Sequence, residues 1–232
     1  MAKPFGVLAL QGDFAAHVAA FRDVGLAAAE VRRVAELEGL AGIMIPGGES
    51  TTLLNLMRDE PWFEALRRFH GGGGVVAGTC AGAILLSRDV RPHQPSLALL
   101  DAIIDRNAYG RQVDSFEARV DAPGLGGHLD AVFIRAPRFR ALWPEVQVLA
   151  RLGSDPVLVR QDRVVAGTFH PELTRSRALH RYLAELAGGA AAPAKTPGAG
   201  RESAALRHGP LEPDARPALG RGSRASREPT AQ

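Results

Sequence analysis

Residues 75–86, with the sequence VVAGTCAGAILL, decide the fold because they join a strand to a helix through a single cysteine, Cys80. The apolar run 75–77 predicts a buried strand, and the apolar run 83–86 predicts a helix. The glycines on either side of Cys80 allow a strained turn that holds its side chain at the end of a sheet. Such a turn is typical of a nucleophile, although the five residues GTCAG at 78–82 are equally compatible with a small buried cysteine beside a tight turn.

Cys80 is the only cysteine in the chain, so no disulfide can form within it. Its expected location at a helix N-terminus favours the thiolate, and a lone thiol suits a reducing compartment. The first residues lack the long apolar segment of a signal peptide. No apolar run approaches the roughly 18 residues needed to cross a bilayer. We therefore expect a soluble cytoplasmic protein.

The first half of the 232-residue chain alternates strand-like and helix-like segments. Strands are predicted at 5–10, 28–32 and 42–46, and helices at 14–25, 34–40, 51–59 and 62–69. This βαβαβ order predicts an α/β fold with a doubly wound, mostly parallel sheet and right-handed crossovers. In such sheets the ligand lies at the carboxyl ends of the strands, where Cys80 and the loop 46–50 both fall.

The second half is rich in strands that are separated by turns. Strand candidates lie at 97–104, 115–120, 132–135, 146–152, 157–160 and 164–169. They predict an antiparallel extension at the edge of the parallel core, and a helix at 177–187 closes the domain. With 46% hydrophobic residues the chain can bury a substantial core. We therefore expect one α/β domain over residues 1–187.

The net charge of +3 lies entirely in residues 188–232, while residues 1–187 are formally neutral. This last segment is rich in Ala, Gly, Pro and Arg and has almost no large apolar residues. It cannot bury enough surface to offset its ordering entropy, so we expect it to be disordered. No aromatic residue lies among its charges, which leaves a nucleic-acid or membrane role weakly supported. We expect neither partner.

The loop Pro46-Gly47-Gly48-Glu49-Ser50 directly follows a predicted strand and precedes a predicted helix. Gly47 and Gly48 free the backbone to present N–H groups, which could form an oxyanion hole, and Ser50 is expected to cap the helix. A phosphate-binding turn is the alternative. It is disfavoured because no Gly-Lys-Ser/Thr follows, and the turn after the first strand lacks the dinucleotide-binding pattern.

The tripeptide His170-Pro171-Glu172 follows the last predicted strand. The proline favours an extended backbone at His170, so that His170 and Glu172 point to the same side. A thiol nucleophile needs such a pair, because the imidazole takes the thiol proton and the carboxylate fixes its tautomer. One His-x-Glu is more often a surface pair. The other six histidines, among them His17 and His180 on predicted helices, have no carboxylate so placed and lack metal-ligand spacing, so no metal is expected.

Several blocks carry a family resemblance. Gly78-Thr79-Cys80-Ala81-Gly82 with the later His-Pro-Glu resembles the class I glutamine amidotransferases, the triad glutaminases. More narrowly, collinear blocks over residues 5–186 resemble the glutaminase subunits of pyridoxal 5'-phosphate synthases; they include PGGESTT at 46–52, Arg106-Asn107, GRQVDSFE at 110–117, FIRAP at 133–137 and FHPELT at 169–174. Periodicity and spacing alone lead only to a cysteine hydrolase of the α/β class.

The resemblance implies a three-layer, flavodoxin-like fold and a triad of Cys80, His170 and Glu172. Cys80 would attack L-glutamine, release ammonia and form a γ-glutamyl thioester that water hydrolyses to glutamate. The substrate-binding residues implied by the resemblance are Gly47, Gly48, Glu49, Ser50, Arg106, Ile134 and Arg135, with Gly47 and nearby amides supplying the oxyanion hole.

The resemblance also implies a partner. In the family the ammonia passes to a separate (β/α)8-barrel synthase subunit, which makes pyridoxal 5'-phosphate. Docking organises the oxyanion hole, and Gln11 and Gly12 resemble the loop that faces the synthase. No bound cofactor is implied for this chain, because pyridoxal phosphate is the product of the partner.

Two other classes of protein remain open. One is a different amidotransferase subunit or a γ-glutamyl hydrolase, against which the blocks at 110–117 and 133–137 argue. The other is a non-enzymatic subunit that only regulates a partner. The intact Cys80, His170 and Glu172 argue against that interpretation.

Overall fold

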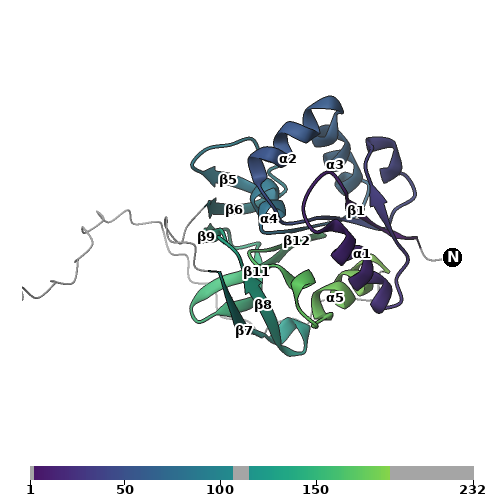
Figure 1. Ribbon diagram of the computed structural model, residues 1–232. Coiled ribbons are helices and arrows are strands. Elements are labelled where there is room, and N and C mark those ends of the chain that lie inside the picture. The colour runs from purple at the N-terminus through teal and green to yellow at the C-terminus, as the bar shows by residue number, and fades with distance from the viewer. Residues whose placement is uncertain (1–2, 107–114, 189–232) are drawn as a thin grey trace, which may run out of the picture. The chain divides into compact units, whose positions relative to one another are not determined.

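The computed structural model describes residues 3–106 and 115–188, which belong to one compact unit spanning Met1–Ala194 (Figure 1). Two expectations fall outside the described residues. One is the disorder expected for the segment that follows Gly188. The other concerns residues 107–114, which hold Asn107 and most of the GRQVDSFE block.

A nine-stranded sheet runs through this unit in the order β2-β1-β3-β4-β12-β11-β10-β7-β8. Its first five strands are parallel: β2 (Ala28–Val31), β1 (Phe5–Leu8), β3 (Gly42–Ile45), β4 (Val75–Thr79) and β12 (Val164–Gly167). Every residue of β1, β3, β4 and β12 is buried, as expected for short apolar runs that are covered on both faces. The predicted doubly wound parallel core is therefore confirmed.

The other four strands of the large sheet are antiparallel: β11 (Asp155–Gln161), β10 (Gln147–Leu152), β7 (Phe116–Ala122) and β8 (Gly127–Phe133). β11 turns back into β12 through a tight turn in which Asp162 has a positive φ of 51°. This arrangement confirms the predicted antiparallel extension, and it places β12 between the two halves of the sheet.

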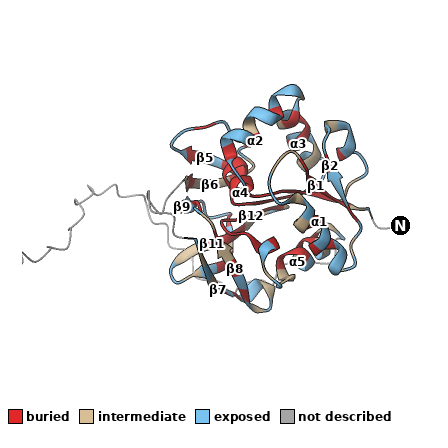
Figure 2. Cartoon of the chain, viewed as in Figure 1, coloured by how far each residue is buried: buried red, intermediate tan, exposed pale blue. Residues whose placement is uncertain are grey.

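Helices cover both faces of the parallel strands (Figure 1). One face carries α1 (Phe14–Asp23) and α5 (Ala178–Ala187); the other carries α2 (Ser50–Leu56), α3 (Trp62–Gly71) and α4 (Ala81–Leu86). Side chains of a strand alternate between its faces, so Ile43 and Ile45 pack with α2, α3 and α4, whereas Met44 packs with α1 and α5. The three layers agree with the expected architecture, and α4 is buried throughout (Figure 2).

A separate three-stranded sheet was not predicted. It consists of β5 (Ser87–Arg91), β6 (Leu100–Asp105) and β9 (Arg138–Leu142). β5 and β9 escaped prediction because charged residues interrupt both of them and they bury only one or two side chains each, which hides the apolar signal of a strand. The predicted strand at 97–104 is confirmed only from Leu100 onward.

Two further expectations are wrong in their extent. The predicted helix at 34–40 is a short 3-10 turn, η1 (Val34–Leu37). The predicted strand at 132–135 is instead β8, which pairs with β7 over its whole length and ends at Phe133. The strand cannot continue through Arg135, because that residue has a positive φ of 43°.

Candidate active site

Cys80 lies in a strained turn between β4 and α4, with φ 48° and ψ −105°. Residues other than glycine rarely adopt such a backbone conformation. Gly78 and Gly82 are both required here, since a Cβ atom on Gly82 would overlap the carbonyl group of Ile45 and one on Gly78 would overlap Gly82. The Cys80 backbone N–H also donates to the Gly167 carbonyl at 2.8 Å. The turn therefore has the geometry of a nucleophile elbow.

His170 follows β12, which is the parallel neighbour of β4, and so it emerges at the same edge of the sheet as Cys80. Its Nδ1 lies 2.8 Å from Glu172 Oε1. His170 itself pairs with Val132 in an isolated antiparallel β-bridge, with φ −109° and ψ 88°. The extended segment expected to continue to Glu172 is wrong, because Glu172 lies in a 3-10 turn, η4 (Pro171–Leu173). A proline at the first helical position favours the start of such a turn. The turn brings the two side chains together by a different route from the one expected.

The ionisation of the pair follows from its surroundings. Burial would lower the pKa of His170, but its interactions with Cys80 and Glu172 outweigh burial and raise the pKa to about 10. Burial would raise the pKa of Glu172, but hydrogen bonds from His17 and His170 hold it well below its usual range. At neutral pH the pair is therefore an imidazolium and a carboxylate. An imidazolium beside a thiol favours the nucleophilic thiolate.

Glu49, and not Ser50, caps helix α2. The Glu49 carboxylate accepts hydrogen bonds from the backbone N–H groups of Thr51 at 2.9 Å and Thr52 at 3.1 Å. Ser50 is the first residue of the helix, and its hydroxyl donates to Gln94 Oε1 at 3.0 Å. The expected Ser50 cap is wrong because Glu49 is the residue just before the helix, and its carboxylate reaches forward to the free N–H groups of the first turn.

Gly47 and Gly48 lie between the catalytic candidates and the turn that follows β1. A Cβ atom on Gly47 would overlap the ring of His170, and one on Gly48, which has a φ of 136°, would overlap Gln11. Gln11 Oε1 accepts from the Glu49 N–H at 3.2 Å, and Gln11 Nε2 donates to the Gly47 carbonyl at 3.5 Å. Gln11 therefore contacts the glycine loop on both sides of Gly48.

A small cavity of about 50 Å³ lies beside Cys80. It is lined by Gly48, Glu49, Ser50, Cys80, Ile84, Arg106, Ile134 and Arg135. Within it, Arg106 Nη2 lies 3.4 Å from Glu49 Oε1. The structure thus brings together all of the substrate-binding residues that the resemblance implied except Gly47, which lies against His170 instead.

Sequence reasoning missed Ile84, which lines this cavity, and His17, which contacts Glu172. His17 Nε2 is 3.2 Å from Glu172 Oε2. A signal for His17 was present, since it falls on the apolar stripe of α1 with Val18 and Phe21. A histidine on the buried face of a helix needs a polar partner.

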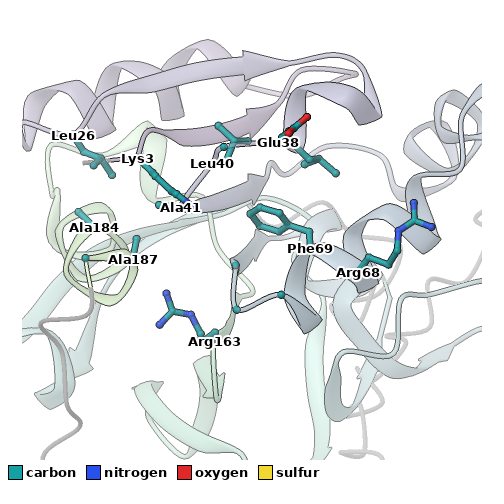
Figure 3. Close-up of a pocket in the computed structure, with 16 residues that line it drawn as sticks. Lys3, Leu26, Glu38, Leu40, Ala41, Arg68, Phe69, Arg163, Ala184 and Ala187 are labelled. Atoms are coloured by element: carbon teal, nitrogen blue, oxygen red, sulfur yellow. The ribbon is translucent and has the colours of Figure 1, made fainter. Parts of the chain in front are cut away.

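A larger cavity, of about 590 Å³, lies at the other end of the parallel strands (Figure 3). Its lining includes Lys3, Ala41, Gly74 and Arg163, which precede β1, β3, β4 and β12, and the Arg163 side chain points into it. Ligands of open α/β sheets bind at the carboxyl ends of the strands, whereas this cavity is at the amino ends. It is therefore not part of the candidate active site.

Within residues 3–106 and 115–188, no group of three or more His, Cys, Asp or Glu side chains is arranged to hold a metal ion. None of the helices in the same residues is both long and apolar enough to span a bilayer.

The sequence model of the SNO glutamine amidotransferase family matches residues 7–187. The pyridoxal 5'-phosphate synthase subunit PdxT of one strain of Thermus thermophilus is 55% identical over 186 residues, covering 79% of this chain and 97% of the relative. The subunit of the same name from Deinococcus radiodurans is 49% identical over 189 residues, covering 79% and 96%.

Two solved structures are also similar. A crystal structure of a glutamine amidotransferase has a TM-score of 0.75 and 51% identity, over 79% of this chain and 98% of that one. A chain of PurLQS from Thermotoga maritima has a TM-score of 0.64 at 15% identity, over 81% and 99%, and shares the fold.

Proposed function

Because the chain belongs to the SNO glutamine amidotransferase family, we propose that it is the glutaminase subunit of a pyridoxal 5'-phosphate synthase. It hydrolyses L-glutamine to L-glutamate and ammonia, and a separate synthase subunit consumes the ammonia. The observation that carries the proposal is the meeting of Cys80, His170 and Glu172 at the carboxyl ends of two adjacent parallel strands. The similarity to the Thermus PdxT subunit, which extends over 97% of that relative, supports it.

The reaction begins with the Cys80 thiolate. Its Sγ attacks the side-chain carbonyl carbon of glutamine, and the C–N bond breaks as the His170 imidazolium gives its proton to the leaving ammonia. A γ-glutamyl thioester remains on Cys80. His170, now neutral, takes a proton from water while the water oxygen attacks the thioester, and the C–S bond breaks to release glutamate. Glu172 stays ionised throughout and stabilises the imidazolium.

The backbone at Gly47 and Gly48 is suited to the oxyanion of the two tetrahedral intermediates. Gly47 has no Cβ atom, so its peptide can lie directly against His170 and Cys80. Backbone N–H groups that are fixed near the reacting carbon stabilise the developing negative charge. We assign the oxyanion hole to this loop on that ground.

Glu49 and Arg106 suit the two charged ends of the substrate. The pair presents a carboxylate and a guanidinium 3.4 Å apart beside Cys80, which complements the α-ammonium and α-carboxylate groups of glutamine.

The contacts of Gln11 give docking a route to this loop. Gln11 hydrogen-bonds to the backbone of Gly47 and Glu49, and a Cβ atom on Gly12 would overlap the Gly47 carbonyl oxygen. A (β/α)8-barrel synthase subunit that binds the Gln11-Gly12 turn would therefore also move or fix the Gly47–Gly48 peptide. We propose that docking activates the glutaminase in this way, and that the protein works in the cytoplasm, where reducing conditions keep a lone thiol reduced.

The test is ammonia release from L-glutamine by the purified chain, alone and with its synthase subunit, beside a Cys80→Ala variant. The expected result is release that depends on the synthase and disappears in the variant. Equal release without the synthase would retain the glutaminase and reject activation by docking. Hydrolysis of γ-glutamyl peptides without ammonia transfer would favour a γ-glutamyl hydrolase, and no release in any mixture would favour a regulatory subunit.

A further inference from the structure

His17 is a buried polar residue that the proposed chemistry does not use. It lies on α1, on the opposite side of Glu172 from His170, and its side chain is fully buried. Its two ring nitrogens each face a polar atom. Nε2 lies 3.2 Å from Glu172 Oε2, and Nδ1 lies 3.0 Å from Nε2 of His180 on α5, which is also fully buried.

The contacts of Glu172 are divided between two imidazole rings. Oε1 accepts from His170 Nδ1 at 2.8 Å, and Oε2 faces only His17 among the described residues. The His17 contact is within ion-pair distance, and Oε2 accepts no hydrogen bond from any other described residue. A buried carboxylate oxygen without a donor is costly, which makes His17 the group that offsets this cost.

His180 determines which nitrogen of His17 carries the proton. Burial lowers the pKa of His180 to about 3, so its ring is neutral and has one proton. With that proton on Nε2, His180 donates to His17 Nδ1, and His17 keeps its own proton on Nε2, facing Glu172. The remaining nitrogen, His180 Nδ1, has no partner among the described residues, so this arrangement avoids a buried unpaired N–H donor there.

We propose that His17 is a positioning residue of the glutaminase: its Nε2–H holds Glu172 in the orientation that aligns His170 with Cys80, and His180 keeps His17 in the donating tautomer. The inference rests on the proposed glutaminase function. It extends the Cys80, His170 and Glu172 set into a buried chain of five side chains that links the reacting thiol to helices α1 and α5.

Few charged groups act on these five buried side chains. Glu172 is influenced by His170 and His17, His170 by Cys80, and His180 by His17, Glu172 and Arg177. Thr79 adds a neutral hydroxyl, with Oγ1 3.4 Å from His17 Nε2. Loss of the His17 donor would therefore act chiefly on Glu172, whose carboxylate would become easier to protonate.

Two substitutions separate the hydrogen bond from the packing. His17→Gln keeps an N–H donor at a similar distance from the backbone, whereas His17→Leu removes it. Val18→Ala is the matched control, because Val18 is the buried apolar neighbour of His17 on the same helix. Each variant is assayed for ammonia release in complex with the synthase subunit, at several pH values, together with its thermal unfolding.

The expected result for His17→Leu is a fall in kcat of about 10- to 100-fold, as misalignment of a catalytic group produces, with KM for glutamine little changed. The acidic limb of its kcat profile shifts to higher pH, because activity requires ionised Glu172. His17→Gln regains most of the activity and the original limb. Val18→Ala lowers the unfolding temperature and leaves kcat and the limb unchanged.

Alkylation of Cys80 by iodoacetamide tests the inference without glutamine. Cys80 is the only cysteine, so the whole signal reports this thiol. At pH 7, His17→Leu should be alkylated more slowly than the wild type and His17→Gln at nearly the wild-type rate, because a misaligned His170 stabilises the thiolate less. The positioning role would be overturned if His17→Leu had the kcat, pH profile and alkylation rate of the wild type. It would also be overturned if His17→Leu and His17→Gln were equally defective. If the variants show the expected order of alkylation rates but the wild type releases no ammonia from glutamine, the positioning role stands and the glutaminase function is rejected.

Discussion

Gly47 lies so close to His170 that a Cβ atom at this position would overlap Cε1 of the imidazole ring. The contact joins the loop after β3 to the residue that follows β12, and these two segments are brought together by the strand order of the parallel sheet. The imidazole of His170 can therefore keep its orientation only if residue 47 has no side chain.

A Gly47→Ala substitution should displace the imidazole and lower kcat/KM for glutamine by roughly 10²-fold, since a displacement of about 1 Å has that effect on a positioned group. Gly71→Ala is the control, because a Cβ atom on Gly71 meets no atom within 4 Å. It should leave kcat/KM unchanged. The measurement is steady-state ammonia release in the complex, and equal kinetics for the two variants would reject the steric argument.

Substitution of Arg106 should act on substrate binding. Arg106→Gln removes the guanidinium beside Glu49, so KM for glutamine should rise by about 10- to 100-fold, the equivalent of a hydrogen bond between charged groups. Thiol alkylation at Cys80 should not change. Arg140→Gln, which breaks the exposed pair of Arg140 and Asp105, controls for the loss of a positive charge and should leave KM as it is. A lowered kcat with unchanged KM would contradict the assignment of Arg106 to the substrate.

The parallel core and the nucleophile turn could be predicted from the sequence because their signals are local. β1, β3 and β4 are short apolar runs that end at glycine or polar residues, and the Cys80 turn is formed by five consecutive residues. The three-stranded sheet could not be predicted in the same way. β5 and β9 each bury only one or two side chains, so they resemble polar loops in their composition.

The His17 contact could not be predicted because it is not local. His17 and Glu172 are on separate elements, near opposite ends of the described chain, and only the packing of α1 against η4 and α5 brings them together. The Ser50 cap failed for a different reason. Ser50 and Glu49 are adjacent and both can accept from a helix N-terminus, and the sequence does not show that the Ser50 hydroxyl instead donates to Gln94, which lies on a distant loop.

Removal of the Gln11 side chain should weaken activation by the partner. Gln11→Ala removes two hydrogen bonds to the loop at Gly47 and Glu49, each contributing about 1 kcal/mol, so kcat at saturating synthase subunit should fall by about 10-fold or more. Titration with the synthase subunit separates this effect from weaker docking. If kcat at saturation equals that of the wild type, Gln11 contributes to docking alone.

The ion pair of His170 and Glu172 should make stability depend on pH in a defined window. The folded pKa of His170 is raised from 6.5 to about 10, so its stabilising contribution is complete below pH 6.5 and is lost as the pH rises through about 10. The folded pKa of Glu172 is lowered from 4.5, so its contribution is present above pH 4.5 and is lost as the pH falls through the folded value. The contribution of the pair is therefore largest between about pH 4.5 and 6.5.

Glu172→Gln should lower the thermal unfolding temperature most strongly inside that window, and the difference from the wild type should shrink toward pH 10. Glu145→Gln makes the same chemical change at an exposed position and controls for the loss of one negative charge. The comparison is made by thermal unfolding at a series of pH values. A difference between wild type and Glu172→Gln that stays constant from pH 5 to pH 10 would mean that the raised pKa of His170 does not depend on Glu172, and the carboxylate would then orient the ring without stabilising its charge.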